Sequence, residues 1–135
     1  GFTAANNGTA TVTNSTLSGN TADYRGGGIA NSGTATVTNS IVLGNTSTNG
    51  DAEIRGAVTN TDNLSIIGGV NAANVFAATT ADGAGVLADN GGPVQTIALK
   101  NDASNPALDA GDDAAAVAAG AATDASWSGR YAASG

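Results

Sequence analysis

The strongest constraint on the fold is an internal repeat. Asn7–Thr21 reads NGTATVTNSTLSGNT, and Ser32–Thr46 reads SGTATVTNSIVLGNT. Matching residues lie 25 positions apart without an insertion, as Val12 and Val37 do. A fixed period in this range is typical of stacked-repeat architectures, in which each repeat packs against its neighbours.

The repeat reaches the first residue of the sequence. Gly1–Asn6 aligns with Gly26–Asn31 at the same spacing, so two units are expected over residues 1–25 and 26–50. The sequence opens on Gly1 and not on methionine, has no signal peptide, and shows no obvious cap at either end. We therefore expect a processed or excised segment of a longer protein.

A looser third unit is expected after these two. Asn63–Gly68 (NLSIIG) matches Asn39–Gly44 (NSIVLG) when the spacing is reduced to 24.

Each unit combines short alternating segments with Gly/Asn turns. In Thr9–Thr13 (TATVT), Ala10 and Val12 fall on one face, the period-2 pattern of a half-buried strand. Leu17 and Ile29 supply two further inward positions in a unit. Three short strands with bends make one turn of a coil, and coils stacked about 4.8 Å apart form a parallel β-helix.

The sequence therefore predicts an all-β fold. We expect a short right-handed parallel β-helix of about 25 residues per coil over residues 1–69. Residues 70–135, where the repeat is lost, are expected to form an irregular C-terminal section that packs on the helix or continues it. This section contains a predicted strand at Val94–Leu99 and a predicted short helix at Ala114–Ala122.

The stacking predicts which residues lie above one another. The expected inner ladders are Ala10/Ala35, Val12/Val37, Leu17/Val42/Ile66 and Ile29/Ile54. A stack of three bend asparagines is also expected: Asn14, Asn39 and Asn63. Stacked amides can bond to one another along the axis, although these residues can equally be ordinary solvent-facing turn asparagines.

One outer face changes from polar to apolar between the units. The residues Thr16 and Ser18 of the first unit become Ile41 and Leu43 in the second, and Ile67 is expected beneath Leu43. Contiguous exposed apolar rows are uncommon on monomers. This row is therefore expected to be covered, either by the chain's own C-terminal half or by self-association with another subunit.

Composition excludes several function classes. The formal net charge is −7 and the pI about 4.1, with four scattered basic residues. Nucleic acid is an unexpected partner because a phosphate backbone needs clustered cations. No apolar stretch approaches the roughly 20 residues of a membrane-spanning helix. The lack of Cys, His and Met, with the acidic Asn/Thr/Gly-rich composition, suits a secreted or cell-surface bacterial protein.

Few residues offer chemistry. Without His or Cys there is no Ser–His or Cys–His arrangement and no ordinary zinc site, so no catalytic or cofactor-binding residue is assigned. Asp51 and Glu53 near Arg55 are the candidates for paired carboxylates, or a solvated charged edge. The only metal candidates, for Ca²⁺, are weak and can equally be turn formers: Asp109, Asp112 and Asp113.

Two stretches carry a family resemblance. GGGIANSGTATVTNSIVLGNT (Gly26–Thr46) resembles the repeat of right-handed parallel β-helix surface proteins of bacteria, such as autotransporter passengers and polymorphic outer membrane proteins. LADNGGPVQTIAL (Leu87–Leu99), followed by NPALDAGD (Asn105–Asp112), is similar to the C-terminal section of choice-of-anchor Q proteins. The family's final D-I-G-A-like strand is missing. The resemblance implies an exported β-helix and no particular activity.

The expected function is that of a non-catalytic extracellular structural protein. It is either a segment of an adhesin-like stalk or a subunit that stacks into an extracellular fibre through its coil ends. The alternative is a carbohydrate-active β-helix enzyme or a carbohydrate-binding module, with a glycan as ligand. An aromatic content of 4% argues against stacking on sugars.

Overall fold

The computed structural model describes residues 4–108, 110 and 111, with side chains from residue 7 onward. Its regular elements are short strands and two single-turn 3₁₀ helices, η1 and η2, and no α-helix occurs in this part of the chain. The strands are β1 (Ala4–Asn6), β2 (Thr9–Thr13), β3 (Thr16–Leu17), β4 (Thr21–Ala22), β5 (Ile29–Asn31), β6 (Thr34–Thr38), β7 (Ile41–Val42), β8 (Thr46–Ser47), β9 (Ile54–Arg55), β10 (Thr59–Asn60), β11 (Ile66–Ile67), β12 (Leu87–Ala88) and β13 (Thr96–Ile97). The 3₁₀ helices are η1 (Thr61–Asn63) and η2 (Ala72–Asn74).

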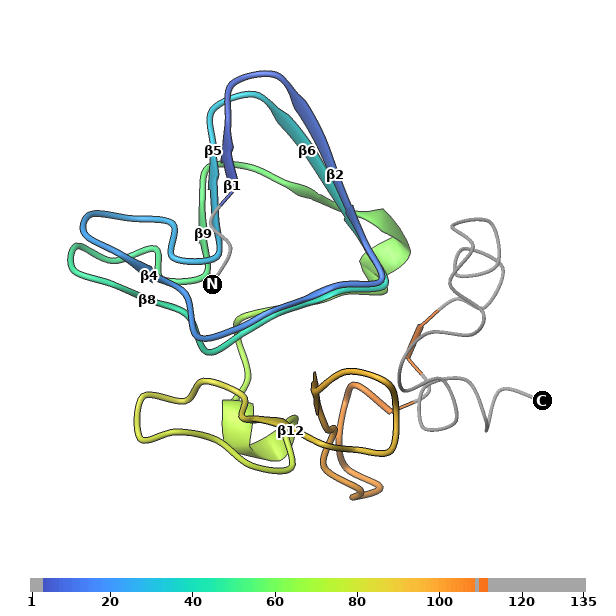
Figure 1. Ribbon diagram of the computed structural model, residues 1–135. Helices are drawn as coiled ribbons and strands as arrows, with labels where there is room; N and C mark the ends of the chain where they lie inside the picture. Colours follow the sequence, from blue (N-terminus) through green and yellow to red (C-terminus); the bar gives the residue numbers. More distant parts are fainter. Residues whose placement is uncertain (1–3, 109, 112–135) are drawn as a thin grey trace.

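The strands form parallel sheets that stack three layers of chain. The sheet orders are β1-β5-β9, β10-β6-β2, β11-β7-β3 and β4-β8, all with parallel pairing. Strands β1–β4 make the first coil, β5–β8 the second and β9–β11 the third. Figure 1 looks along the stack, where the three coils nearly superimpose as a triangle. The fold is therefore all-β and β-helix-like.

The strand register confirms most of the predicted ladders. Ala10 lies opposite Ala35 and Val12 opposite Val37 in β2 and β6. Leu17 lies opposite Val42, and Ile29 lies opposite Ile54. The inner core consists of the buried Leu17, Ile29, Val37 and Val42, with Val12, Ile54, Val58 and Ile67 packed against them. β-branched side chains prevail in this core because they pack well on the pleated surface of strands.

The third coil has a different register from the one predicted. Ile66 lies opposite Ile41, and Ile67 opposite Val42, so Ile67 is an inward residue and Ile66 is not. The predicted third member of the Leu17/Val42 ladder was therefore wrong by one residue, as was the placing of Ile67 beneath Leu43.

The third coil departs from an offset of 25 at β10 and returns to it through a longer corner. Thr59 lies opposite Thr36, an offset of 23, whereas Ile66 lies opposite Ile41, an offset of 25. The 3₁₀ helix η1 supplies the two additional residues, with Asp62 in the left-handed region at φ 52°. Matching Asn63–Gly68 to Asn39–Gly44 reduced the spacing to 24, whereas the unreduced spacing of 25 pairs Ile66 with Ile41 as the structure does.

Each of the first two coils also has a fourth short strand. Strands β4 and β8 pair in register, and the Thr21 and Thr46 hydroxyls bond to each other at 2.9 Å. In Figure 1 these strands lie on a lobe that projects from one corner of the triangle. The sequence reasoning expected three strands per coil and missed this one, since two residues are too few to show an alternating pattern.

The C-terminal section covers the apolar outer face of the second coil. Leu43 is buried together with Ala72, Val75 and Phe76, and Ile41 packs against this second cluster. Ile97, Leu99 and Ala107 complete the cluster from further along the chain. The row at Ile41 and Leu43 is thus covered by the chain itself, which was one of the two predicted alternatives.

The predicted strand at Val94–Leu99 is shorter in the structure. Only β13 is a strand, paired antiparallel with β12. A single antiparallel bridge joins Phe76 to Leu99. The predicted helix at Ala114–Ala122 lies outside the described residues.

The cover of the outer face gives a first prediction. Phe76 is 1% exposed, so Phe76→Ala should remove its contacts with Leu43 and lower the free energy of unfolding by about 3–5 kcal/mol. Chemical denaturation of the variant measures this loss. The control is Val94→Ala, at a residue that is 59% exposed, with an expected change within about 0.5 kcal/mol. Equal small effects of the two variants would contradict the described cover.

Candidate functional site

The most distinctive polar arrangement is a buried stack at the Gly-Asn-Thr bend. Asn20 and Asn45 are 4% and 5% exposed and occupy the same place in the first two coils. The backbone N–H of Asn20 and its Nδ2 both donate to Oδ1 of Asn45, at 3.0 and 2.9 Å. Nδ2 of Asn45 donates to the backbone carbonyl of Leu17 at 2.9 Å. These bonds tie the first coil to the second.

Glu53 ends this stack in the third coil. Its carboxylate accepts from Nδ2 of Asn45 at 2.6 Å and from the backbone N–H of Asn45 at 3.3 Å. The backbone N–H of Gly44 donates to the same carboxylate at 2.8 Å. The negative charge thus lies against a left-handed bend, with Gly44 at φ 76°, whose amides point toward it.

The position of Glu53 follows from the repeat. Ile54 lies opposite Ile29, so Glu53 takes the place that Gly28 has in the second coil. A Cβ built on Gly28 would lie 3.1 Å from Nδ2 of Asn45, which shows that this position faces the asparagine stack. In the third coil a glutamate replaces the glycine, and its carboxylate lies below Asn45, where a third asparagine would continue the stack.

The carboxylate fixes the direction of every amide above it. An ionised carboxylate only accepts hydrogen bonds, so Asn45 must turn Nδ2 toward Glu53 and Oδ1 toward Asn20. Asn20 must in turn direct its Nδ2 toward Asn45, which leaves its own Oδ1 as the last acceptor. This Oδ1 is buried and has no hydrogen-bond partner among the residues that the structure describes.

A second polar stack runs through three serines. The backbone N–H of Ser15 donates to Oγ of Ser40, and that of Ser40 donates to Oγ of Ser65, each at 3.1 Å. The hydroxyl of Ser40 donates to the carbonyl of Thr38 at 2.8 Å. Sequence reasoning missed this stack, although a serine every 25 residues in the printed sequence signals it.

The predicted asparagine stack is placed differently by the structure. Asn14 and Asn39 lie at equivalent corners in the left-handed region, at φ 51° and 48°. Asn63 lies in the longer corner of the third coil, at the end of η1. The bond between Ser40 and Ser65 shows that Leu64, and not Asn63, is in register with Asn39. Bonding between the Asn14 and Asn39 amides stays a prediction.

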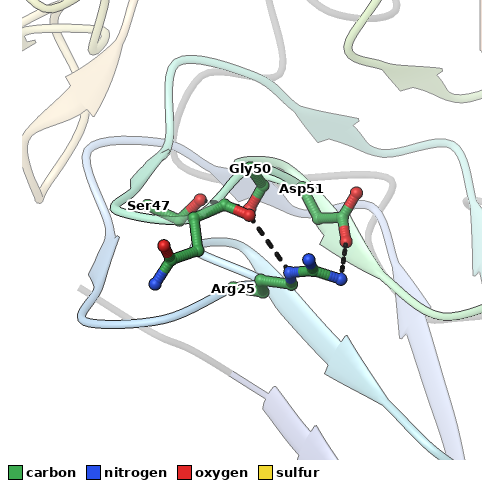
Figure 2. A network of polar contacts seen from close by, with 5 residues as sticks. Arg25, Ser47, Gly50 and Asp51 are labelled. Carbon is green, nitrogen blue, oxygen red and sulfur yellow. Dashed lines mark hydrogen bonds and ion pairs between the residues drawn. The ribbon is translucent and has the colours of Figure 1, made fainter.

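The candidate carboxylates have separate partners. Asp51 pairs with Arg25 at 3.6 Å, as Figure 2 shows. Nε of Arg25 also donates to the carbonyl of Asn49 at 3.1 Å. Both charged side chains are more than two-fifths exposed, so the pair contributes little to stability. Arg55 is exposed, on β9. Asp51 and Glu53, two residues apart, are thus engaged in different interactions.

The calcium candidates Asp109, Asp112 and Asp113 lie outside the described residues. Within residues 4–108, 110 and 111, no group of three or more acidic, His or Cys side chains is placed to hold a metal ion. One exposed acid is perturbed: the hydroxyl and backbone N–H of Ser104 bond to Asp102 and lower the pKa of that carboxyl. This pair shapes a turn in the C-terminal section.

Comparisons with protein families, with curated proteins and with solved structures found no match to this chain. A search of the described residues found no helix long and apolar enough to cross a membrane.

The carboxylate of Glu53 gives a second prediction. Glu53→Ala leaves the amides of Gly44 and Asn45 without their acceptor, which should lower the free energy of unfolding by about 2–4 kcal/mol. Glu53→Gln keeps one acceptor oxygen and should lose about half as much. The matched control is Asp51→Asn, which removes only the exposed ion pair and tolerates the left-handed backbone; its expected loss is below about 1 kcal/mol. If denaturant titration showed that Asp51→Asn lowers the free energy of unfolding more than Glu53→Ala does, this role of Glu53 would be rejected.

A third prediction is that replacing Asn45 lowers the free energy of unfolding more than replacing Asn20 does. Asn45→Ala removes the acceptor that Asn20 uses and the donor that Glu53 and Leu17 accept from. The free energy of unfolding should therefore fall by about 2–4 kcal/mol. Asn20→Ala removes only the bond from Nδ2 of Asn20 to Asn45, three fewer than Asn45→Ala removes, and Oδ1 of Asn20 has no described partner to lose. The expected loss of unfolding free energy is therefore about 1–2 kcal/mol. The same titration ranks the two variants, and the reverse order would contradict the directional stack.

Proposed function

We propose that this chain is a non-catalytic structural segment of a secreted or cell-surface bacterial protein, built as part of an adhesin-like stalk. The observation that supports the proposal is that the buried polar groups form hydrogen bonds between successive coils. Asn20, Asn45 and Glu53 bond from coil to coil, and the three serines do the same. Such groups strengthen a stack along its axis and present no converging reactive atoms to a ligand.

We further propose that the coil is right-handed with a basic period of 25 residues. Strand offsets of 25 in β1–β5, β2–β6, β3–β7 and β4–β8 support the period, and the third coil departs from it only around its longer corner. We base the proposed surface location on the sequence resemblance of three stretches to exported β-helix proteins: Gly26–Thr46, Leu87–Leu99 and Asn105–Asp112.

The unlike ends of the stack favour a stalk segment over a fibre of identical subunits. The first coil ends in the acceptor Oδ1 of Asn20, and the third coil carries the carboxylate of Glu53 at the equivalent place. Stacking one copy on another would bring two acceptors together without a donor, which is unfavourable.

A fourth prediction separates the functions. The purified chain should stay monomeric in light scattering as its concentration rises, and electron micrographs should show no filaments. It should release neither reducing ends nor unsaturated products from neutral and acidic polysaccharides, and it should not bind a glycan array.

Each other outcome supports a rival function. Filaments would establish the fibre version. Turnover of a polysaccharide that is lost in both Asp51→Asn and Glu53→Gln would establish the enzyme. Binding to glycans without turnover would establish a carbohydrate-binding module.

A further inference from the structure

The edge of the first coil has an incomplete hydrogen-bonding position at Asn20. This side chain is 4% exposed, yet its Oδ1 has no partner among the described residues. One layer below, the equivalent oxygen of Asn45 accepts two bonds, from the backbone N–H and Nδ2 of Asn20. Leaving a buried amide oxygen without a hydrogen-bond partner is unfavourable, so the site favours a donor.

The layer below also defines what the donor must be. Oδ1 of Asn45 is satisfied by an asparagine that follows a glycine with φ 73° and precedes a threonine on β4. The hydroxyls of Thr21 and Thr46 meet at 2.9 Å beside it. The matching group for Asn20 is therefore a second Gly-Asn-Thr bend placed one coil further along the stack.

A groove beside the same edge supplies a second observation. A space of about 400 Å³ is lined by Ser15, Thr16, Leu17, Ser18, Asn20, Gly85, Leu87 and Ile97. It touches Leu17 and Asn20 on the inner face of the coil and Thr16 and Ser18 on its outer face, so it runs along the open edge of β3. We call it the first-coil groove.

The outer wall of this groove comes from the C-terminal section. The backbone N–H of Gly85 donates to the Ser18 hydroxyl at 2.8 Å and holds the wall against the first coil. Leu87 in the wall is 59% exposed. In the second coil, by comparison, the outward Leu43 is buried against Phe76. The C-terminal section thus leaves the apolar surface of Leu87 uncovered beside the first coil. No outward side chain of the described coils covers it.

We propose that the first-coil edge is a docking surface for a further parallel β-coil that carries a Gly-Asn-Thr bend. Its asparagine donates N–H and Nδ2–H to Oδ1 of Asn20, and its outward residues enter the first-coil groove against Leu87 and Ile97. This deepens the proposed function, on which it rests, by naming the partner that the stalk segment accepts and the end that accepts it.

A second copy of this chain does not fit that description. Its third coil carries Glu53 where the donor asparagine is needed, and its first coil carries the same acceptor oxygen as the surface it would meet. The incoming coil therefore has the sequence character of the second coil, residues 26–50, with the bend intact.

The test adds one such coil to the whole chain. A copy of residues 26–50 is joined ahead of Gly1, so that its Gly-Asn-Thr bend falls 25 positions before that of Asn20. The matched variant has the same extension with Asn→Ala at the position copied from Asn45. Thermal unfolding is followed for both and for the unextended protein, and proteolysis reports whether the added coil is folded.

The expected result is a rise in Tm of about 4 °C or more in the extended protein. The Asn→Ala extension should lose at least half of this rise. Leu87→Ser should reduce the rise further than Val94→Ser does, because both side chains are 59% exposed but only Leu87 lines the groove.

Two results would overturn the proposal. If the added coil is cleaved rapidly and Tm does not change, the edge does not accept a coil. If both extensions raise Tm equally, the asparagine of the incoming bend is not recognised. Neither result bears on the glycan and polysaccharide assays, so a structural role without an accepting edge remains distinguishable from an enzyme.

Discussion

The interaction on which the stack depends is the acceptance of amide hydrogens by the Glu53 carboxylate. Two coil amides and the Nδ2 of Asn45 converge on it, and an ionised carboxylate can only accept. Asn45 and Asn20 are therefore oriented in one direction through two layers. A neutral asparagine at the same place would leave the direction of the stack to its surroundings. The charge makes the two ends of the stack chemically different.

Much of this architecture can be predicted from the sequence, because the repeat fixes the register. The match of Val12 to Val37 and of Ile29 to Ile54 follows from counting 25 positions, and the pairs lie opposite each other in the sheets. The middle of the third coil could not be placed this way, because Thr59 of β10 lies opposite Thr36 with an offset of 23. Its corner at η1 holds two more residues than the corner at Asn39, and a one-residue error in spacing reverses which side chain points inward.

The functional candidates were harder to predict than the register. Glu53 reads in the sequence as one of two nearby acids, and only its alignment with Gly28 reveals that it faces the inside of the coil. The asparagines that stack inside are those of the Gly-Asn-Thr bend, whereas the sequence drew attention to Asn14 and Asn39 at the corners. Repetition marks both pairs equally. Burial distinguishes them, and burial depends on how the bend turns in space.

The C-terminal section completes the argument about direction. It buries the outward Leu43 of the second coil under Phe76, yet over the first coil it offers the exposed Leu87 and a hydrogen bond from Gly85 to Ser18. A wall built only to cover these three coils would not need apolar surface beside the polar outer residues of the first. Leu87 lies along the same edge at which Asn20 lacks a donor. Polar and apolar requirements therefore coincide at one end of the stack, whereas Glu53 satisfies the amides at the other.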